Sequence, residues 1–432
     1  MADVRRLIDE GRISAMQVGV IAICTLMNML DGMDVMVISY SAPSLVEEWG
    51  IQSTSLGMVF SAALLGMAVG AAFLAPWADV IGRRNIILIC IVVMGGGVLA
   101  TAAAQEIWHL VALRFISGLG IGAMLASTVT LASEYAPERQ RNFVVSIVLT
   151  GYPIGATLSG LVAAQIIPVY GWRAMFLTAG AATAITLPLA YYLLSESWEW
   201  LVKKQPRHAL QRLNVILDEM GHAAMDKLPA MTEEAKKAPG VESLLGHGRA
   251  RATIQLWTAF FMGFATLYLL VTWIPNLARN TGMSIELAIY AGTVFNLGAI
   301  FGNLSQGYSS QIIGLRQAIV IFYFVTALMM MAFGYVTGNW LILIVFGLIG
   351  FGVQGGLIGL YTVGARIYPA EVRNTGIGWA IGAGRTGAII SPLIGGWLAS
   401  RGVSPATSLF IFAFPLLIAC VAIWTLRAKE VS

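Results

Sequence analysis

Residues 70–84 read GAAFLAPWADVIGRR, and residues 302–316, which lie 232 positions later, read GNLSQGYSSQIIGLR. The two stretches share the glycines at their first and thirteenth positions and the arginine at their last position. The constant offset extends over Gly, Pro, Arg and Asn positions, which are Gly50/Gly282, Gly70/Gly302, Gly82/Gly314, Arg84/Arg316, Gly118/Gly350, Gly120/Gly352, Pro137/Pro369, Arg141/Arg373, Asn142/Asn374 and Gly155/Gly387. Insertions would have broken this register. The sequence therefore predicts two copies of one unit of roughly 200 residues.

The composition indicates a chain that lies in lipid. Hydrophobic residues make up 58% and charged residues 11%, against roughly 45–50% and 25% in soluble domains. Stretches long enough to cross a hydrocarbon core of about 30 Å recur at about 17–39, 55–77, 85–104, 108–132, 142–165, 172–194, 252–277, 285–311, 316–336, 339–362, 374–398 and 405–426. Six fall in each copy, which predicts an all-α polytopic membrane protein.

Lysine and arginine collect on one side of the membrane, and an even number of spans puts both chain ends on that side. It holds Arg5, Arg6, Arg12, Arg83, Arg84, Arg139, Arg141, the cluster from Lys203 to Arg251, Arg316, Arg366, Arg373, Arg427 and Lys429, whereas the other side holds Arg173, Arg279 and Arg401. We therefore expect both termini in the cytoplasm. The same bias explains the net charge of +4, which requires no nucleic-acid partner.

Charged residues also mark a boundary between the two copies. We expect a first unit at 1–194, a cytoplasmic linker at 195–251 and a second unit at 252–432. Within the linker, apolar residues at helical spacing predict a short surface helix between Pro206 and Met220.

The stretch from Gly70 to Arg84 ends in a charged loop on the cytoplasmic side. A carboxylate near a helix end, beside two guanidinium groups, forms a cluster that can be made and broken as helices move. The candidate gating residues are Asp79, Gly82, Arg83 and Arg84; the alternative is that the arginines only fix topology. This stretch resembles the loop signature of the major facilitator superfamily. The resemblance implies twelve helices in two pseudo-symmetric six-helix bundles, and a gating role for the loop.

The second copy of the loop has lost most of its charge. Gln311 stands at the aspartate position and Leu315 at the first arginine position. We therefore expect a gating charge cluster of this type in the first half and not in the second.

Arg114 lies several residues inside the fourth span. A buried arginine costs several kcal/mol unless it has a partner or faces a water-filled cavity, so it is a functional candidate. The first span supplies Asp31 and Asp34, three residues apart on neighbouring parts of one helix face. An aspartate that exchanges Arg114 for a proton is a workable coupling device; a permanent ion pair between Asp31 and Arg114 is the alternative.

Glu134 adds an acidic group near the cytoplasmic end of the fourth span. It is a candidate proton-exit relay, or a member of a charge cluster at a helix end. The proton-coupling candidates are thus Asp31, Asp34, Arg114 and Glu134. His109, His208, His222 and His247 lie in loops or at a span edge and are poorly placed to carry protons.

In the second half, Arg385 lies deep in the eleventh span among small residues, with no Asp or Glu in the surrounding spans. Its planar fork suits a carboxylate, which makes it the candidate substrate anchor. The alternative is hydrogen bonding to backbone carbonyls. The polar and aromatic residues Gln354, Asn296 and Tyr361 are further substrate-binding candidates, together with Asp34; amides in a span also bond neighbouring helices.

Taken together, the pair Asp31 and Asp34, the charged loop, Arg114 before its glycines, the Ser195-Glu196-Ser197 segment and the glycines around Arg385 resemble the aromatic acid:proton symporter family. The resemblance covers the whole chain. It implies import of benzoate-type carboxylates with protons, by alternating access, with no cofactor beyond the proton gradient and as a monomer.

Two other function classes are weighed against this one. The first is a proton-driven exporter of drugs or metabolites, or a symporter of a non-aromatic acid; the fifth span reads Gly151-Tyr152-Pro153-Ile154-Gly155 and lacks the Gly-Pro pair of antiporters. The second is a receptor or enzyme on the same scaffold. No phosphate-binding loop, nucleophile elbow or metal-spaced His/Cys cluster supports it, so we expect no enzyme activity and no metal.

Overall fold

The computed structural model describes residues 2–11, 13–228, 244–246, 249–368 and 372–426. The long helices are α2 (Ala15–Trp49), α3 (Ser53–Val69), α5 (Arg83–Thr101), α6 (Ile107–Tyr135), α7 (Arg141–Leu193), α11 (Ala250–Asn280), α12 (Ile285–Ile313), α13 (Leu315–Ala332), α14 (Asn339–Ile367), α15 (Arg373–Ser400) and α16 (Pro405–Trp424). Short elements are α1 (Ala2–Glu10), α4 (Ala78–Ile81), α8 (Trp198–Lys204) and α9 (Ala209–Glu219), with tight turns at Gly70–Leu74, Ala75–Trp77, Glu138–Gln140 and Phe333–Tyr335.

The twelve predicted spans are confirmed, although the described part of the chain has eleven long apolar helices. The difference lies in α7, where Gly171 adopts non-helical φ/ψ angles of 77° and 172°. Glycine tolerates this positive φ, so the chain can reverse direction at Gly171 while the residues before and after it remain helical. Helix α7 thus contains two spans. The predicted surface helix is also present, as α9.

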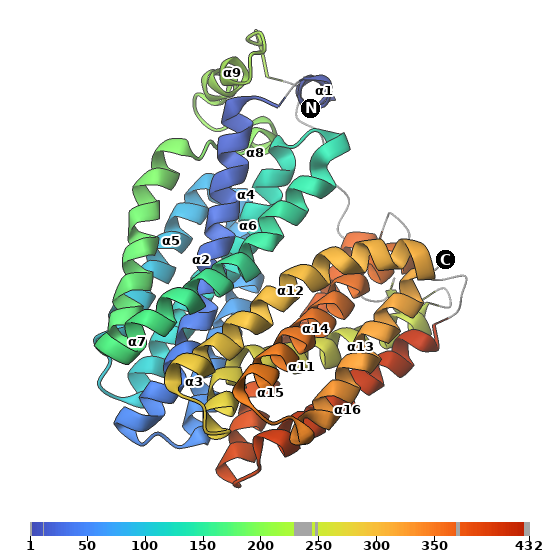
Figure 1. The fold of residues 1–432 in the computed structure, drawn as a ribbon. Coiled ribbons are helices and arrows are strands. Elements are labelled where there is room, and N and C mark those ends of the chain that lie inside the picture. Colours follow the sequence, from blue (N-terminus) through green and yellow to red (C-terminus); the bar gives the residue numbers. More distant parts are fainter. Residues whose placement is uncertain (1, 12, 229–243, 247–248, 369–371, 427–432) are drawn as a thin grey trace.

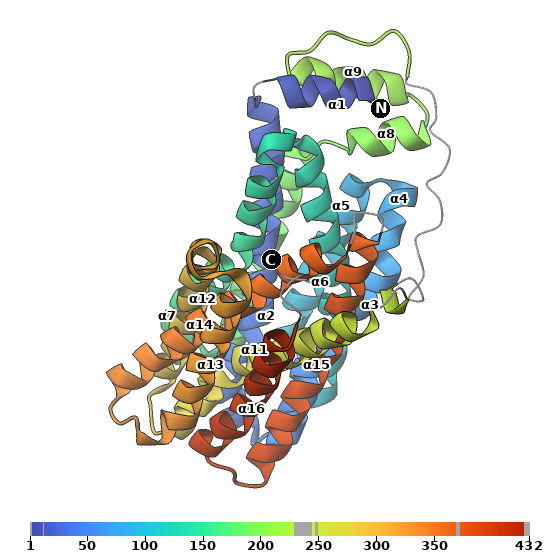
Figure 2. The same cartoon turned by 90° about the vertical axis from the view of Figure 1, so that its right-hand side faces the viewer.

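The helices form two pseudo-symmetric six-helix bundles (Figures 1 and 2). The repeated glycines explain part of the symmetry. Gly50, Gly82, Gly282 and Gly314 all have a positive φ, of 61°, 99°, 94° and 89°, at corresponding helix ends. Residues other than glycine rarely adopt this backbone conformation. The repeated glycines therefore mark turns at the same positions in both halves.

Other repeated glycines lie where helices touch backbone to backbone. A Cβ atom added at Gly70 would come within 2.1 Å of the Leu119 carbonyl oxygen, and one at Gly302 within 2.1 Å of the Phe351 carbonyl oxygen. Leu119 and Phe351 are themselves 232 residues apart. The contact of α3 with α6 is therefore repeated between α12 and α14, as small residues at membrane helix interfaces permit.

The glycine Gly122 on α6 gives a test of this packing. Its added Cβ would lie 1.9 Å from the Met67 carbonyl oxygen, whereas one added at Gly96 meets nothing within 4 Å. We expect Gly122→Ala to destabilise the detergent-solubilised protein by about 1–3 kcal/mol, and Gly96→Ala to leave its thermal unfolding unchanged. Equal unfolding temperatures for both variants would contradict the close helix contact.

The two ends of the molecule differ. We call the end where α2 begins and α16 ends the terminal end, and the end where α2 finishes and α16 starts the distal end. Helices α1, α8 and α9 gather at the terminal end of the first bundle (Figures 1 and 2). The two bundles meet mainly through α3 with α15, α7 with α12, and α2 with α11.

Candidate functional site

A buried ion pair lies inside the first bundle. Arg114 on α6 is 0% exposed, and its Nη1 atom is 2.8 Å from Oδ1 of Asp34 on α2. Its Nη2 donates to Thr101 Oγ1 at 3.3 Å, and its guanidinium carbon lies 5.2 Å from the centre of the Phe176 ring. Helices α2, α5, α6 and α7 thus all hold Arg114. The partner is Asp34, rather than the Asp31 named in the ion-pair alternative.

Asp31 lies three residues earlier on α2 and has a different environment. The residue is 2% exposed, yet neither carboxylate oxygen has a hydrogen-bond partner among the described residues. Beside it, Gly32 packs against the backbone of Tyr152 on α7, whose carbonyl oxygen would be 2.0 Å from a Cβ at Gly32. The Tyr152 hydroxyl is also buried without a described partner. Unsatisfied polar atoms of this kind require an explanation.

Arg385 on α15 brings the second bundle into this region. Its Nη1 atom is buried and has no hydrogen-bond partner among the described residues. Its charge acts on Asp31 and Tyr152 in the first bundle and on Tyr361 in the second. Arg385 therefore lies between the two bundles. The sequence predicted no acidic residue around Arg385; its acidic neighbour is Asp31, which belongs to the first bundle.

Aromatic rings line the second-bundle side of this region. The rings of Phe264 and Tyr268 on α11 stack at 5.8 Å, and Phe260 contacts Tyr361 on α14 edge-on at 5.1 Å. Gly384, next to Arg385, would place a Cβ 2.8 Å from the Phe264 ring. These rings therefore lie beside the part of α15 that carries Arg385.

The two amide candidates differ in their surroundings. Gln354 on α14 has a buried Oε1 atom without a described partner. Asn296 on α12 is 2% exposed and donates to the Gly292 carbonyl oxygen at 2.9 Å. Asn296 also lies within hydrogen-bonding reach of Tyr40 on α2, which donates to the Ala156 carbonyl oxygen at 2.8 Å. The described contacts thus place Asn296 at the junction of α2, α7 and α12.

The charged loop at the terminal end is tied to the first bundle and the segment after it. Arg83 forms an ion pair with Glu134, which also accepts a hydrogen bond from Ser197 Oγ at 2.5 Å. The Arg84 amide donates to Glu196 Oε1 at 3.0 Å and its Nε to the Leu194 carbonyl oxygen at 2.7 Å. Glu134 is therefore a member of a helix-end charge cluster.

Gly82 and Asp79 complete this cluster. Gly82 has a φ of 99°, and a Cβ there would lie 2.3 Å from Glu196 Oε2. The Asp79 side chain is exposed, its carbonyl oxygen accepts from Trp200 Nε1 at 3.1 Å, and its charge acts on Arg83. The sequence analysis did not name Glu196 as a site residue. Its position directly after the sixth span, on the same side of the membrane as Arg83 and Arg84, could have indicated that it joins their charge cluster.

The bonds between the two bundles lie toward the distal end. Arg279 on α11 and Glu47 on α2 form an ion pair at 2.6 Å. Ser61 Oγ on α3 donates to the Ile389 carbonyl oxygen at 2.7 Å, and Gln165 on α7 donates to the Tyr290 hydroxyl at 3.2 Å. The described bundles are thus held together on the side away from the charged loop.

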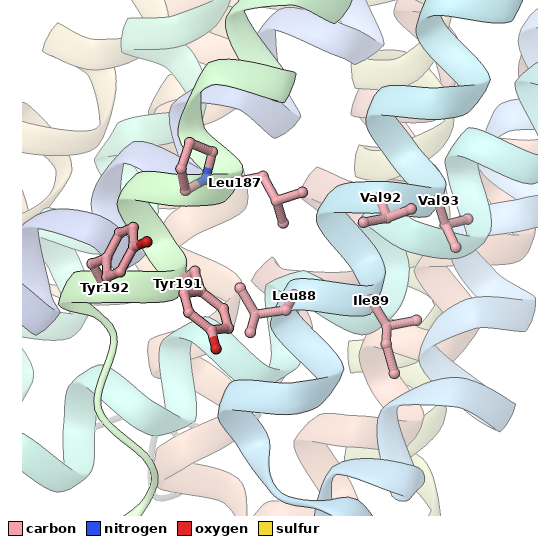
Figure 3. Close-up of a pocket in the computed structure, with 8 residues that line it drawn as sticks. Leu88, Ile89, Val92, Val93, Leu187, Tyr191 and Tyr192 are labelled. Carbon is pink, nitrogen blue, oxygen red and sulfur yellow. The ribbon is translucent and has the colours of Figure 1, made fainter.

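A separate groove of about 530 Å³ lies on the outside of the first bundle, between α5 and α7 (Figure 3). Its lining is apolar and aromatic: Leu88, Ile89, Val92, Val93, Leu187, Pro188, Tyr191 and Tyr192. Such a lining suits hydrocarbon chains rather than a carboxylate. We therefore place the functional site between the bundles and not here.

Two pseudo-symmetric bundles of six spans, with charged side chains inside the first bundle and at the junction of the two, are typical of a polytopic membrane carrier. The chain belongs to the major facilitator superfamily, whose model matches residues 24–302 and 256–432. The relatives described next are transporters by name.

The resemblance to aromatic acid carriers is confirmed by these relatives. The 4-hydroxybenzoate transporter PcaK of Acinetobacter baylyi is 32% identical over 432 residues, covering 98% of this chain and 93% of that protein. A gallate transporter of Pseudomonas putida is 32% identical over 424 residues, covering 98% and 94%. A benzoate transport protein of Acinetobacter baylyi is 26% identical over 436 residues, covering 99% and 93%.

Solved structures agree with the fold. A D-xylose–proton symporter superposes with a TM-score of 0.74 at 19% identity, covering 96% of this chain and 98% of that one. A bacterial homologue of the lysosomal transporter Spinster, in an inward-facing and occupied conformation, gives a TM-score of 0.75 at 15% identity, covering 94% and 95%.

Proposed function

We propose that this protein imports a small aromatic carboxylate together with protons, by alternating access. The observation that carries the proposal is Arg385, a half-buried residue whose buried Nη1 atom has no described hydrogen-bond partner and whose neighbour Gly384 packs against the Phe264 ring. A guanidinium fork binds a carboxylate in a bidentate manner. The rings of Phe264 and Tyr361 supply apolar contact for a substrate ring. The relatives that carry hydroxybenzoate, gallate and benzoate support this substrate class.

The distribution of Lys and Arg supports a cytoplasmic terminal end in a bacterial inner membrane. Since the described inter-bundle bonds lie toward the distal end, we take this conformation as the inward-facing one. The cluster of Asp79, Gly82, Arg83 and Arg84 then gates the cytoplasmic side, because its contacts in this state stay within the first bundle and the linker. The linker of this arrangement runs over 195–251, between units 1–194 and 252–432.

The acidic groups of the first bundle couple proton movement to transport. Asp31 or Asp34 carries the proton, Arg114 tunes the pair, and Glu134 takes part at the cytoplasmic end. Gln354, Tyr361 and Asn296 are the further substrate contacts. The carrier works as a monomer in the bilayer, needs the proton gradient and no cofactor, and has no nucleic-acid partner.

The substrate class is tested with the purified protein in liposomes preloaded with unlabelled acid, in a counterflow assay that needs no gradient. We expect labelled 4-hydroxybenzoate and benzoate to enter, and an aliphatic acid of similar charge, such as hexanoate, to enter at least about tenfold more slowly, because a few buried ring contacts are worth about 1–3 kcal/mol. No uptake of any acid, combined with gradient-driven extrusion of a cationic dye, would contradict the proposal and indicate an exporter.

A further inference from the structure

Several buried polar atoms near the junction of the bundles lack described partners, and among them are the two Asp31 oxygens, the Tyr152 hydroxyl and the Arg385 Nη1 atom. These three groups come from α2, α7 and α15, so two belong to the first bundle and one to the second. Partnerless buried polar atoms are costly, and an acid, a hydroxyl and a guanidinium are complementary to one another. Gly32, next to Asp31, packs against the Tyr152 backbone, and the Arg385 charge acts on both Asp31 and Tyr152. The three groups are therefore close enough to exchange partners.

Asp34 has no such freedom. It is held by Arg114 at 2.8 Å, with Arg114 fully buried and further bound to Thr101. Freeing Asp34 for a proton would leave the Arg114 charge uncompensated, which is strongly unfavourable in a buried site. Of the two first-span acids, Asp31 is the one whose charge can change without breaking an existing ion pair.

From this arrangement we infer that Asp31 and the substrate carboxylate compete for Arg385, with the Tyr152 hydroxyl hydrogen-bonding whichever carboxylate is bound. Without substrate, ionised Asp31 supplies the counter-charge of Arg385, without a direct hydrogen bond between the described atoms. When the substrate carboxylate binds Arg385, Asp31 loses its counter-charge and takes up one proton from water, so one anion and one proton enter together. Tyr152 is a positioning residue in this exchange. The inference rests on the proposed function of the same site.

The groups that influence the charge of Asp31 come from several helices. They are Asp34 on α2, Cys90 on α5, Arg114 on α6 through Asp34, Tyr152 on α7 and Arg385 on α15. Tyr268 on α11 acts on Tyr152. Arg385 is the cationic group of this set that is not already in an ion pair among the described residues, which is why its occupation by substrate decides the charge of Asp31.

The test is equilibrium binding of labelled 4-hydroxybenzoate to the full-length protein in nanodiscs between pH 5.5 and 8.5, where the substrate carboxyl is ionised. If one proton is bound with each anion, affinity falls about tenfold per pH unit in the alkaline range, by linkage. In Asp31→Asn, whose side chain cannot ionise, we expect affinity that does not change with pH and equals the acidic-limit affinity of the parent protein.

Two tyrosine variants sharpen the test. Tyr152→Phe removes a hydrogen bond to ionised Asp31, so the pH at which binding begins to weaken moves upward. Tyr323, on α13, has an equally buried hydroxyl without a described partner. Because it lies in the second bundle away from Asp31, Tyr323→Phe is the matched control and keeps the parent profile.

The outcomes separate the inference from the proposed function. If the parent protein binds no aromatic acid at any pH, the proposed function is wrong. If the parent binds the acid but Asp31→Asn retains the parent slope, the acid is carried and the exchange at Arg385 is wrong. A flat profile in Asp31→Asn, with the upward shift in Tyr152→Phe alone, is the result that we expect.

Discussion

Arg385→Ala loses substrate binding by about 2–5 kcal/mol, the cost of removing one partner of a buried charge pair, which is a factor of about 30 or more in affinity and abolishes uptake at micromolar substrate. The folded protein is expected to keep most of its stability, because Arg385 Nη1 has no described hydrogen bond to lose and Asp31, once it has lost its counter-charge, takes up a proton. Both quantities are measured on purified protein, by binding of labelled 4-hydroxybenzoate and by thermal unfolding.

Arg401→Ala is the matched control, since Arg401 is an exposed arginine that directly follows the same helix at its distal end. It is expected to bind substrate as the parent does. Parent-like binding by Arg385→Ala would remove Arg385 from the substrate site and favour the alternative that it only bonds backbone carbonyls.

The second large effect concerns the buried pair of Asp34 and Arg114. Asp34→Asn is expected to destabilise the protein by about 3–5 kcal/mol and to abolish gradient-driven uptake, because it leaves the buried Arg114 charge uncompensated. Asp31→Asn provides the control: it makes the same chemical change three residues away, where no described hydrogen bond is lost, so its stability stays close to that of the parent.

The double variant Asp34→Leu with Arg114→Met removes both charges at once. We expect it to recover most of the lost stability, since replacing a whole buried pair by apolar residues is often neutral, but not the transport activity. Thermal unfolding of the four proteins gives the comparison. Equal destabilisation by Asp31→Asn and Asp34→Asn, or no recovery in the double variant, would contradict a structural role for the Asp34–Arg114 pair.

The fold was largely accessible from the sequence because its causes are local and repeated. Span length follows from the thickness of the bilayer, and the repeated glycines mark turns such as Gly82 and Gly314 and close helix contacts such as Gly70 and Gly302. The reversal at Gly171 falls in the break that the sequence predicted between the spans 142–165 and 172–194.

The site was accessible only in part. Asp31 and Asp34 differ by about 60° around the helix axis, and which of them faces Arg114 depends on the rotation of α2 against α6, which the pattern does not determine. Tyr152 was missed because an aromatic residue in a span usually indicates packing. The nearness of Arg385 to Asp31 could not be predicted, because the repeat relates the bundles to each other without fixing how they dock.

The most direct test of proton-coupled import is accumulation of labelled 4-hydroxybenzoate in proteoliposomes with an inward proton gradient. The account predicts internal substrate above the external concentration, loss of that accumulation when a protonophore is added, and counterflow without accumulation in Asp31→Asn. Accumulation that is unchanged by the protonophore, or full accumulation by Asp31→Asn and Asp34→Asn alike, would contradict proton coupling through the first-span acids.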